Sequence, residues 1–452
     1  MRVFVFIIGI FIVAGGVFIM LKSDKNIEGV EFVEINGIKV PLIFEKSELL
    51  PIGSVQFIFN GGGSAYDWQN ASQNFSEFSA QDSVQAKAGL ASLAASLLNA
   101  GTKELGSVGF AEKLESKAVS LRAQTSTRTL SFNLSFLTEY KDFALDCLVE
   151  LLHSPNATDE EFSKVKTLAN TAILAKQNNF DYIAGVNLNK IFFAGTPLGF
   201  ERTIESIESL RLSDITQYLH NTIALNRLII VAGGDMDKEE LKQDLRTRLT
   251  SLPKGSTVDK PIIKPERNLH YIESKKPTQQ AYIYFSSPFN ADVSEAYKTK
   301  VMSFVLGGSG FGSRIMEEVR VKRGLAYSAY FSIIGSSDVI NYGTGHLQTG
   351  LDSKDEALSV VREVMREFVE NGITQDELDS AKAFILGSEP LREETLSQRL
   401  DAKFGNYFKG LPLDNHKRDI QKIANLTLDE INTFIKSHKE ILDLSVSVVD
   451  TE

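Results

Sequence analysis

The sequence predicts an α+β protein made of two homologous domains, each with a mostly antiparallel sheet and helices packed on one face. Three observations lead to this prediction. The chain has 452 residues, which is too long for a single hydrophobic core. Short segments with alternating apolar residues are interspersed with longer helical patterns. The order of these segments in the first half is repeated in the second half.

Composition and charge place the chain among folded globular proteins. Hydrophobic residues make up 43% and charged residues 23%, both close to the averages for such proteins. The net charge of −10 and the absence of a Lys/Arg-rich run argue against a nucleic-acid partner. The single cysteine, Cys147, excludes an intrachain disulfide. Its place in an apolar helical pattern predicts a buried side chain.

Residues 1–25 are predicted to direct the chain to a membrane. Arg2 precedes an uncharged run from Val3 to Leu21, which Lys22 and Lys25 follow. Secretory signals have an apolar run of ~7–15 residues, and a spanning helix needs about 20. No clear cleavage site follows the run, so we expect a signal-anchor, with a cleaved signal as the alternative. The chain would then be exported, either anchored by residues 3–21 on the periplasmic side of the inner membrane or free in the periplasm.

The internal repeat is visible in two pairs of helical patterns. Residues 159–169 resemble residues 375–385, and each segment follows a threonine and has acids in its first turn, which is a helix-start signal. The pattern that begins at Leu212 resembles the one that begins at Leu426. Both of these lead into β-rich runs, at 226–232 and at 442–449. The constant order and spacing indicate duplicated domains rather than a solenoid.

The remaining segments complete the two domains. Further strands are predicted at 30–44, 55–60, 129–135, 281–286 and 328–334. Residues 252–266 are rich in Pro and Lys and lack periodicity, which indicates a linker. We therefore expect a first domain over 26–251 and a second over 267–452. The polar insertion 65–87 is rich in Gln, Asn and Ser and is predicted to be a surface loop.

The segment from Gly89 to Thr102 reads Gly-Leu-Ala-Ser-Leu-Ala-Ala-Ser-Leu-Leu-Asn-Ala-Gly-Thr. It resembles the active-site helix of the pitrilysin/insulinase family of inverted zincins, of the mitochondrial-processing-peptidase type, whose signature is His-x-x-Glu-His. Ser92, Ala95 and Ser96 stand at the three signature positions. Two serines at this spacing are poor ligands for zinc. The resemblance implies two domains that face each other across a chamber.

Zinc hydrolysis needs three protein ligands and a carboxylate that takes a proton from water. The sequence provides no suitable set of these groups. No two of the six histidines lie within five residues of each other, so no helical pair of imidazoles can form. In the family the third ligand is a glutamate on the following helix, here the one that opens at Asp159. Residues 162–180 contain no acid. We therefore predict no metal in this chain and expect zinc in a partner subunit.

The second half keeps a different signature. Residues 319–327 read Val-Arg-Val-Lys-Arg-Gly-Leu-Ala-Tyr, which resembles an Arg and Tyr pair that in the family contacts the carbonyl oxygen of the substrate. A guanidinium and a phenol at that point stabilise the negative charge of a tetrahedral intermediate. Arg323 and Tyr327 are therefore the candidate catalytic residues. The alternative is that Arg323 belongs to a basic surface cluster and Tyr327 to the core.

A glycine-rich run at 307–314 raises the question of a phosphate-binding loop. It lacks the Lys-Ser/Thr ending of such loops and does not follow a clear parallel strand. We interpret it as a turn that begins a helix.

Two functions are consistent with these observations. In the first, the chain is the non-zinc subunit of a heterodimeric zinc metallopeptidase, since some bacterial members of the family divide the two signatures between separate polypeptides. A homologous zinc-bearing chain would then supply His-x-x-Glu-His, and this chain would supply Arg323 and Tyr327. A peptide substrate would bind extended along a sheet edge, for which residues 122–137 are the candidate. In the second, the chain is a catalytically inactive scaffold or peptide-binding pseudoenzyme.

Overall fold

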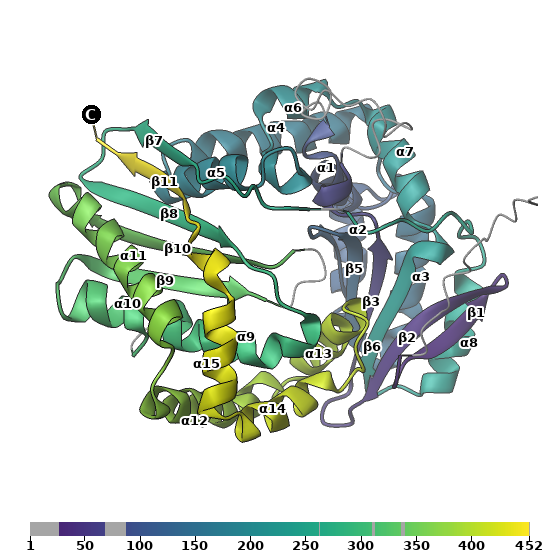
Figure 1. Ribbon diagram of the computed structural model, residues 1–452. Helices are drawn as coiled ribbons and strands as arrows, with labels where there is room; N and C mark the ends of the chain where they lie inside the picture. The colour runs from purple at the N-terminus through teal and green to yellow at the C-terminus, as the bar shows by residue number, and fades with distance from the viewer. Residues whose placement is uncertain (1–26, 68–86, 262, 310–311, 336–339, 452) are drawn as a thin grey trace, which may run out of the picture.

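The computed structural model describes residues 27–67, 87–261, 263–309, 312–335 and 340–451. It has two sheets, one in each half of the chain, with helices packed around both (Figure 1). The predicted α+β fold with two homologous domains is confirmed. The predicted membrane-directing run 3–21 and most of the polar insertion 65–87 lie outside the described residues. Within those residues, no helix has the length and apolar character needed to cross a membrane.

The first sheet has six strands in the order β1-β2-β6-β3-β5-β4. β2 and β6 are parallel, and the other neighbouring pairs are antiparallel. The strands are β1 (Glu31–Ile35), β2 (Ile38–Lys46), β3 (Ile52–Asn60), β4 (Ser120–Thr125), β5 (Thr129–Leu137) and β6 (Leu228–Gly234).

The second sheet has five strands in the order β7-β11-β8-β10-β9. The strands are β7 (Tyr271–Lys275), β8 (Gln280–Pro288), β9 (Ala326–Ile334), β10 (Tyr342–Gly350) and β11 (Ser445–Asp450). Only the β7–β11 pair is parallel. Apart from the additional edge strand β1, the first sheet has the same order, because in both sheets the last strand of the half lies between its first and second strands. The two halves therefore share one topology.

The helices repeat as well. In the first half α3 (Lys141–His153) precedes α4 (Asp159–Lys176), and in the second α11 (Lys354–Asn371) precedes α12 (Gln375–Arg392). The predicted helix starts are confirmed, because Thr158 accepts a hydrogen bond from the Glu161 amide and Thr374 accepts one from the Glu377 amide. α7 (Leu212–Thr222) and α15 (Leu428–Ser437) form the second repeated pair. The other long helices are α1 (Leu90–Leu98), α2 (Gly106–Glu115), α5 (Phe180–Phe192), α8 (Lys238–Arg248), α9 (Ala296–Ser303), α13 (Leu396–Phe408) and α14 (Asn415–Asn425).

The strands differ from the prediction at residues 30–44 and in β10. The predicted strand 30–44 is a hairpin of β1 and β2, because Asn36 and Gly37 both have positive φ angles, 50° and 77°, and form a tight turn. The interior strand β10 was not predicted, because its sequence, Tyr-Gly-Thr-Gly-His-Leu-Gln-Thr-Gly, has no apolar alternation.

Glycines in β10 make room for aromatic rings on the neighbouring strands. A Cβ atom at Gly345 would lie 2.6 Å from the Phe285 ring and 2.3 Å from the Tyr330 carbonyl oxygen. A Cβ atom at Gly343 would lie 2.2 Å from the Phe331 ring. The Phe285 and Phe331 rings stack with their centroids 6.0 Å apart. The strand therefore takes its core packing from its neighbours rather than from its own side chains.

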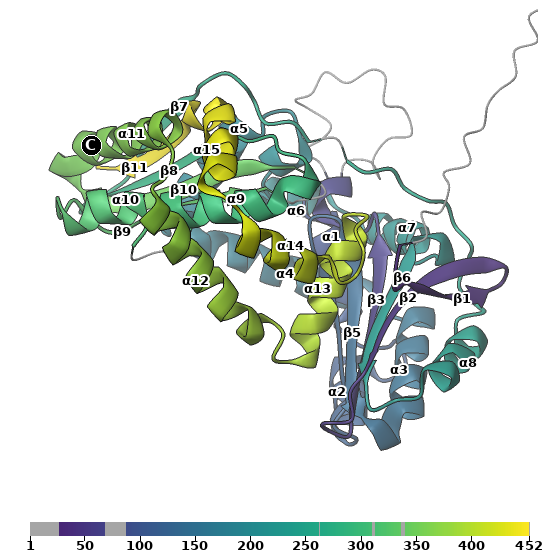
Figure 2. The same ribbon diagram turned by 60° about the horizontal axis from the view of Figure 1, so that its bottom comes forward.

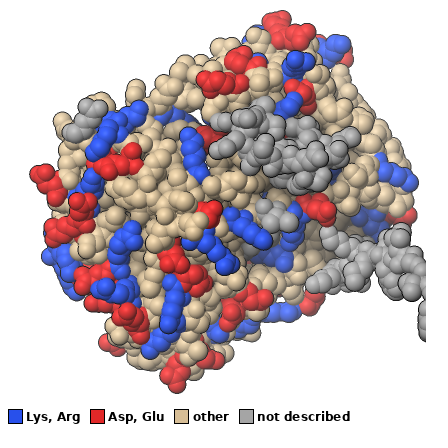
Figure 3. Space-filling view, turned by 45° about the horizontal axis from the view of Figure 1, so that its top comes forward, with Lys and Arg blue, Asp and Glu red and all other residues tan. Residues whose placement is uncertain are grey.

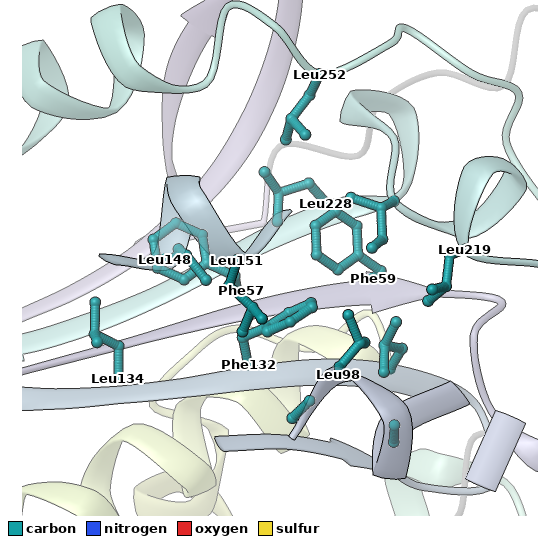
Figure 4. Close-up of a cluster of buried hydrophobic side chains, with 14 of the residues drawn as sticks. Phe57, Phe59, Leu98, Phe132, Leu134, Leu148, Leu151, Leu219, Leu228 and Leu252 are labelled. Atoms are coloured by element: carbon teal, nitrogen blue, oxygen red, sulfur yellow. The ribbon is translucent and has the colours of Figure 1, made fainter. Parts of the chain in front are cut away.

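One face of each sheet is covered by helices of its own half. Figure 4 shows the first core, where Phe57, Phe59 and Phe132 of the sheet meet leucines of α1, α3 and α7. Cys147 on α3 lies in this core and is 1% exposed, which confirms the prediction that it is buried. The second core is built in the same way from β8 to β11 with α9, α11, α12 and α15.

The other face of each sheet is covered by a helix from the opposite half. α5, from the first half, packs on β8 and β11 of the second sheet. α13, from the second half, packs on β2 and β6 of the first sheet. Both contacts are apolar: Leu400 of α13 lies against Ile43 and Val231, and Phe192 of α5 lies against Tyr342. Figures 1 and 2 show the two helices in this exchanged arrangement.

We predict opposite stability effects for two glycine-to-alanine substitutions. Gly345→Ala should lower the free energy of unfolding by about 1–3 kcal/mol, because the new methyl group has no room between Phe285 and the Tyr330 carbonyl. Gly387→Ala is the control, because this exposed position in α12 has no atom within 4 Å of the new methyl group. It should raise the free energy of unfolding by ~0.5–1 kcal/mol through helix propensity. Denaturant unfolding measures both, and equal effects would contradict the packing described for β10.

Candidate functional site

Helix α1 carries the three signature positions and is held at its N-terminus by a buried carboxylate. Asp67 accepts hydrogen bonds from the backbone amides of Gly89 and Ala91, both at 2.9 Å. Gly89 has φ 102°, a left-handed conformation that favours glycine. The helix is buried on most sides against α4, α7 and β4. Its N-terminal turn is therefore fixed in place, although the chain before it lies outside the described residues.

None of the three signature positions offers a metal ligand. Ser92 is half-buried, and its hydroxyl accepts a hydrogen bond from the guanidinium of Arg202 at 2.7 Å. Ala95 is buried in the core, and Ser96 is exposed. A cationic side chain therefore contacts the position where the signature has its first histidine.

A cavity of about 580 Å³, which we call the α1 cavity, lies at the N-terminal end of α1. Among the polar and charged residues of its wall are Asp67, Ser92, Lys176, Tyr182, Glu201 and Arg202. A second cavity of about 390 Å³ shares Ser126, Thr127 and Leu198 with it and is also lined by Tyr342 and Phe408 of the second half. The α1 cavity therefore borders the space between the two halves.

Sequence reasoning did not single out Asp67, Arg202 or Tyr182. Burial, the largest effect, raises the pKa of Asp67 to about 7, against the two backbone amides and the Arg202 charge, which lower it. The Tyr182 hydroxyl donates to Glu201 at 2.6 Å, and the Lys176 ammonium lies 4.5 Å from the centroid of the Tyr182 ring. These residues follow no spacing pattern in the sequence, because they come from four separate segments.

Arg323 and Tyr327 lie at the N-terminal end of β9, in the second half of the chain. A π-helical segment (Glu317–Val321) leads into β9 through a turn in which Gly324 has φ 63°. Arg323 forms an ion pair with the carboxylate of Glu318 and donates to its carbonyl oxygen at 3.0 Å. The Tyr327 side chain is 80% exposed, so it does not belong to the core. The Arg320 guanidinium stacks on its ring, 4.3 Å from the centroid.

The structure does not bring the two signatures together. The wall of the α1 cavity contains neither Arg323 nor Tyr327. α1 lies in the first half of the molecule, and β9 is the edge strand of the second sheet (Figures 1 and 2). The two signatures therefore lie in different halves and do not line a common cavity in the described residues.

The glycine-rich run 307–314 has a packing role. A Cβ atom at Gly307 would lie 2.5 Å from the Phe331 amide nitrogen, so glycine allows the chain to pass close to β9. Arg314 at the end of the run begins a short helix and donates two hydrogen bonds to Glu377, at 2.6 and 2.7 Å. The interpretation of this run as a helix start agrees with the structure.

The candidate peptide edge 122–137 covers two strands and needs correction. β4 is the edge strand of the first sheet, but β5 lies inside the sheet between β3 and β4. The edge of β4 is partly occupied: the Asn99 side chain donates to the Ala123 carbonyl and accepts from its amide, both at 2.8 Å. Only part of this edge is therefore open to another strand.

A further cluster, of His346 and two tyrosines, lies on the face of the second sheet that α5 covers. The His346 ring stacks on Tyr284 with their centroids 5.0 Å apart and meets Tyr330 edge-on at 4.2 Å. The Tyr284 hydroxyl donates to Asp181 of α5 at 3.2 Å. Burial lowers the pKa of His346. An uncharged imidazole between two aromatic rings is a packing element rather than a metal ligand.

Comparison with known proteins decides the family. The family model described as "Insulinase (Peptidase family M16)" matches residues 79–203, and "Peptidase M16 inactive domain" matches residues 209–385. The chain is 42% identical over 441 residues, 97% of both chains, to the "Non-peptidase homolog YmxG" of Helicobacter pylori. The chain belongs to the insulinase (M16) family. The M16 inactive-domain structure from Pseudomonas fluorescens superposes with a TM-score of 0.80 at 21% identity, covering 94% of this chain and 98% of that one.

The structure of a longer protease is also similar. The periplasmic protease PqqL of Escherichia coli superposes with a TM-score of 0.75 at 12% identity. The match covers 94% of this chain but 46% of that protease. That protein is therefore long enough for two units of this size.

The M16 family implies zinc, but the residues of this chain do not fit it. Serine and alanine replace the signature ligands, and the Arg202 guanidinium would repel a cation at Ser92. In the described residues, no three His, Cys, Asp or Glu side chains gather closely enough to hold a metal ion. The relative of 42% identity is named a non-peptidase. The signature positions of this chain therefore lack the ligands and the catalytic glutamate of the M16 zinc site.

We predict that restoring the signature will not restore the metal site. The triple substitution Ser92→His, Ala95→Glu and Ser96→His should bind less than stoichiometric zinc, because Arg202 lies beside the first position and α4 carries no acid after its first turn. Metal analysis of the purified variant and digestion of a peptide library provide the measurement. One tightly bound zinc per chain together with peptide cleavage would contradict the account of the site.

The raised pKa of Asp67 predicts a distinctive pH dependence of stability. Between pH 3.8 and about 7 the folded chain retains a proton that the unfolded chain has lost, so this group lowers the free energy of unfolding as pH rises. Asp67→Asn should remove that decline. The free energy of unfolding of the variant should therefore rise relative to that of the wild type between pH 3.8 and about 7.

Asp237→Asn is the control for this experiment. Asp237 is an exposed helix cap whose pKa is lowered, chiefly by its hydrogen bond from the Glu240 amide. Its effect should have the opposite sign and appear only at acid pH. Unfolding titrations across pH provide the measurement, and a difference between Asp67→Asn and wild type that does not change with pH would contradict the prediction.

Proposed function

We propose that this chain is the non-zinc subunit of a heterodimeric M16 peptidase, in which it presents Arg323 and Tyr327 to a substrate held by a homologous zinc-bearing subunit. The observation that carries the proposal is the exposure of this pair in a chain that lacks the rest of the catalytic apparatus. Tyr327 is 80% exposed, and Arg323 pairs with Glu318 in the turn before it. A tyrosine this exposed contributes little to the core and is accessible to another molecule.

The surroundings of the pair support a second chain at this surface. β9 is an edge strand, which leaves one row of its backbone groups open to pairing. Val321, two residues before Arg323, is 56% exposed. The length of the periplasmic protease that shares this fold agrees with two such units acting together.

The chemistry of the pair suits a carbonyl oxygen. When a peptide carbonyl is attacked, negative charge develops on its oxygen, and a guanidinium and a phenol hydroxyl directed at that atom stabilise it more than they stabilise the ground state. In this proposal the metal and the attacking water belong to the partner. This chain binds and orients the peptide and contributes two hydrogen-bond donors.

The compartment is part of the proposal. The uncharged run 3–21 favours export, with the folded chain on the periplasmic side of the inner membrane or free in the periplasm. Cell fractionation of the full chain and of a chain without residues 1–25 tests this. Equal amounts of both in the cytoplasm would contradict it.

The alternative function is a catalytically inactive scaffold or peptide-binding pseudoenzyme. It is favoured by the name of the relative of 42% identity, a non-peptidase homolog, and by the match to the M16 inactive domain. The two functions differ in whether Arg323 and Tyr327 affect turnover in a complex.

We predict that Arg323→Ala and Tyr327→Phe will each lower kcat of the reconstituted pair about 100–1,000-fold, the usual cost of losing one donor to a developing oxyanion. The measurement is the steady-state kinetics of the His-x-x-Glu-His homologue from the same genome mixed with each variant. Gel filtration checks that the complex still forms.

Arg366→Ala is the matched control, because this arginine is exposed on α11 and is distant in sequence from the pair. Arg320→Ala does not serve as a control, because its guanidinium stacks on the Tyr327 ring. Unchanged kinetics in both test variants would leave the scaffold function. A loss of activity caused only by failed association would make the two residues part of an interface.

A further inference from the structure

The α1 cavity contains two cations whose charges are not neutralised by ion pairs with described carboxylates. Arg202 donates to the neutral hydroxyl of Ser92, and the Lys176 ammonium lies over the Tyr182 ring. The two acids of the cavity are engaged elsewhere: Glu201 accepts from the Tyr182 hydroxyl, and Asp67 accepts from backbone amides of α1. The remaining donors of the Arg202 guanidinium are therefore available for an anionic ligand.

Arg202 is held in a fixed position. Its side chain crosses Gly89, where a Cβ atom would lie 3.2 Å from the Arg202 Cδ, and glycine leaves that path open. The Ser92 hydroxyl fixes one end of the guanidinium at 2.7 Å. Arg202 also interacts electrostatically with the buried Asp67 carboxyl. A pre-positioned guanidinium loses little entropy when it binds a planar anion.

The neighbouring sheet edge accepts the end of a peptide better than its middle. Along β4, alternate residues direct their backbone groups to the open edge, and Ala123 is one of them because Asn99 bonds its amide and carbonyl. Thr125 therefore also faces the open edge, and it lines the α1 cavity. A peptide that continued along β4 from Thr125 towards Ala123 would have to displace the Asn99 side chain. A peptide that ended at the cavity would not.

The same cavity has an apolar side. The apolar part of its wall is formed by Pro197, Leu198 and Phe200. A ligand that fits must combine a carboxylate with an apolar group.

We propose that the α1 cavity binds the C-terminal residue of a peptide, with Arg202 recognising the terminal carboxylate and the wall of Pro197, Leu198 and Phe200 receiving an apolar terminal side chain. Lys176 adds a second positive charge, and Thr125 offers backbone groups to the last residues of the peptide. The site holds a chain end where the zinc-bearing members of the family place a metal. This inference goes beyond the proposed function, because it needs neither zinc nor a second subunit.

The test uses the full chain and a fluorescent, N-acetylated hexapeptide that ends in leucine. Three forms are compared by fluorescence anisotropy: the free acid, the C-terminal amide, and an amide with aspartate at the penultimate position. The free acid should bind at least tenfold more tightly than either amide, and rising salt should weaken its binding. Arg202→Gln should reduce the affinity for the free acid to that of the amide and leave amide binding unchanged.

Arg246→Gln is the matched control, since this exposed arginine lies on α8, away from the cavity. Lys176→Gln and Ser92→Ala provide second variants if Arg202→Gln fails to fold, and each should weaken acid binding several-fold. Equal affinity for acid and amide would overturn the proposal. So would tight binding of the aspartate amide, which would show that the cavity reads any carboxylate rather than a chain end. If Arg202→Gln loses binding of the free-acid peptide while the reconstituted pair keeps its normal kinetics, the α1 cavity acts independently of the proposed catalytic role.

Discussion

Both sheets of this protein have two apolar faces, and the need to cover all four faces determines how the halves fit together. Helices of the same half can cover only one face of each sheet. The second face is covered by exchange, with α13 on the first sheet and α5 on the second. Because apolar burial is the main favourable term in folding, this exchange ties the two halves to each other. Their relative position follows from it, and so does the position of everything that lies between them.

The α1 cavity depends on this exchange. The first turn of α5 carries Asp181, which accepts from Tyr284 of the second sheet, and Tyr182, which donates to Glu201 in the cavity wall. One turn of helix therefore joins the second sheet to the wall around Ser92 and Arg202. At one edge of the second sheet, Arg323 and Tyr327 lie at the start of β9, where the Tyr327 side chain is exposed. The chain thus separates the α1 cavity, which lacks the signature ligands, from an exposed pair of donors at a sheet edge.

The parts of this arrangement that follow local sequence rules could be predicted, and those that depend on contacts between distant segments could not. The duplicated helices α4 and α12 were predictable because threonine caps and acidic first turns are local signals. The loss of the zinc site was readable from Ser92, Ala95 and Ser96. β10 was missed because its glycines gain their meaning only from Phe285 and Phe331 across the sheet. Arg202 was missed for the same reason: it lies 110 residues from Ser92, and no spacing rule relates the two.

The central claim is that this chain has exchanged metal binding for the binding and positioning of a peptide beside a zinc-bearing partner. A crystal structure of the complex with that partner, recorded with zinc anomalous diffraction, tests it most directly. The account predicts one zinc in the partner, none beside Ser92 and Arg202, and the side chains of Arg323 and Tyr327 directed at the space next to the metal. Zinc bound beside Ser92, or an Arg323–Tyr327 pair that points away from the partner's metal, would contradict it.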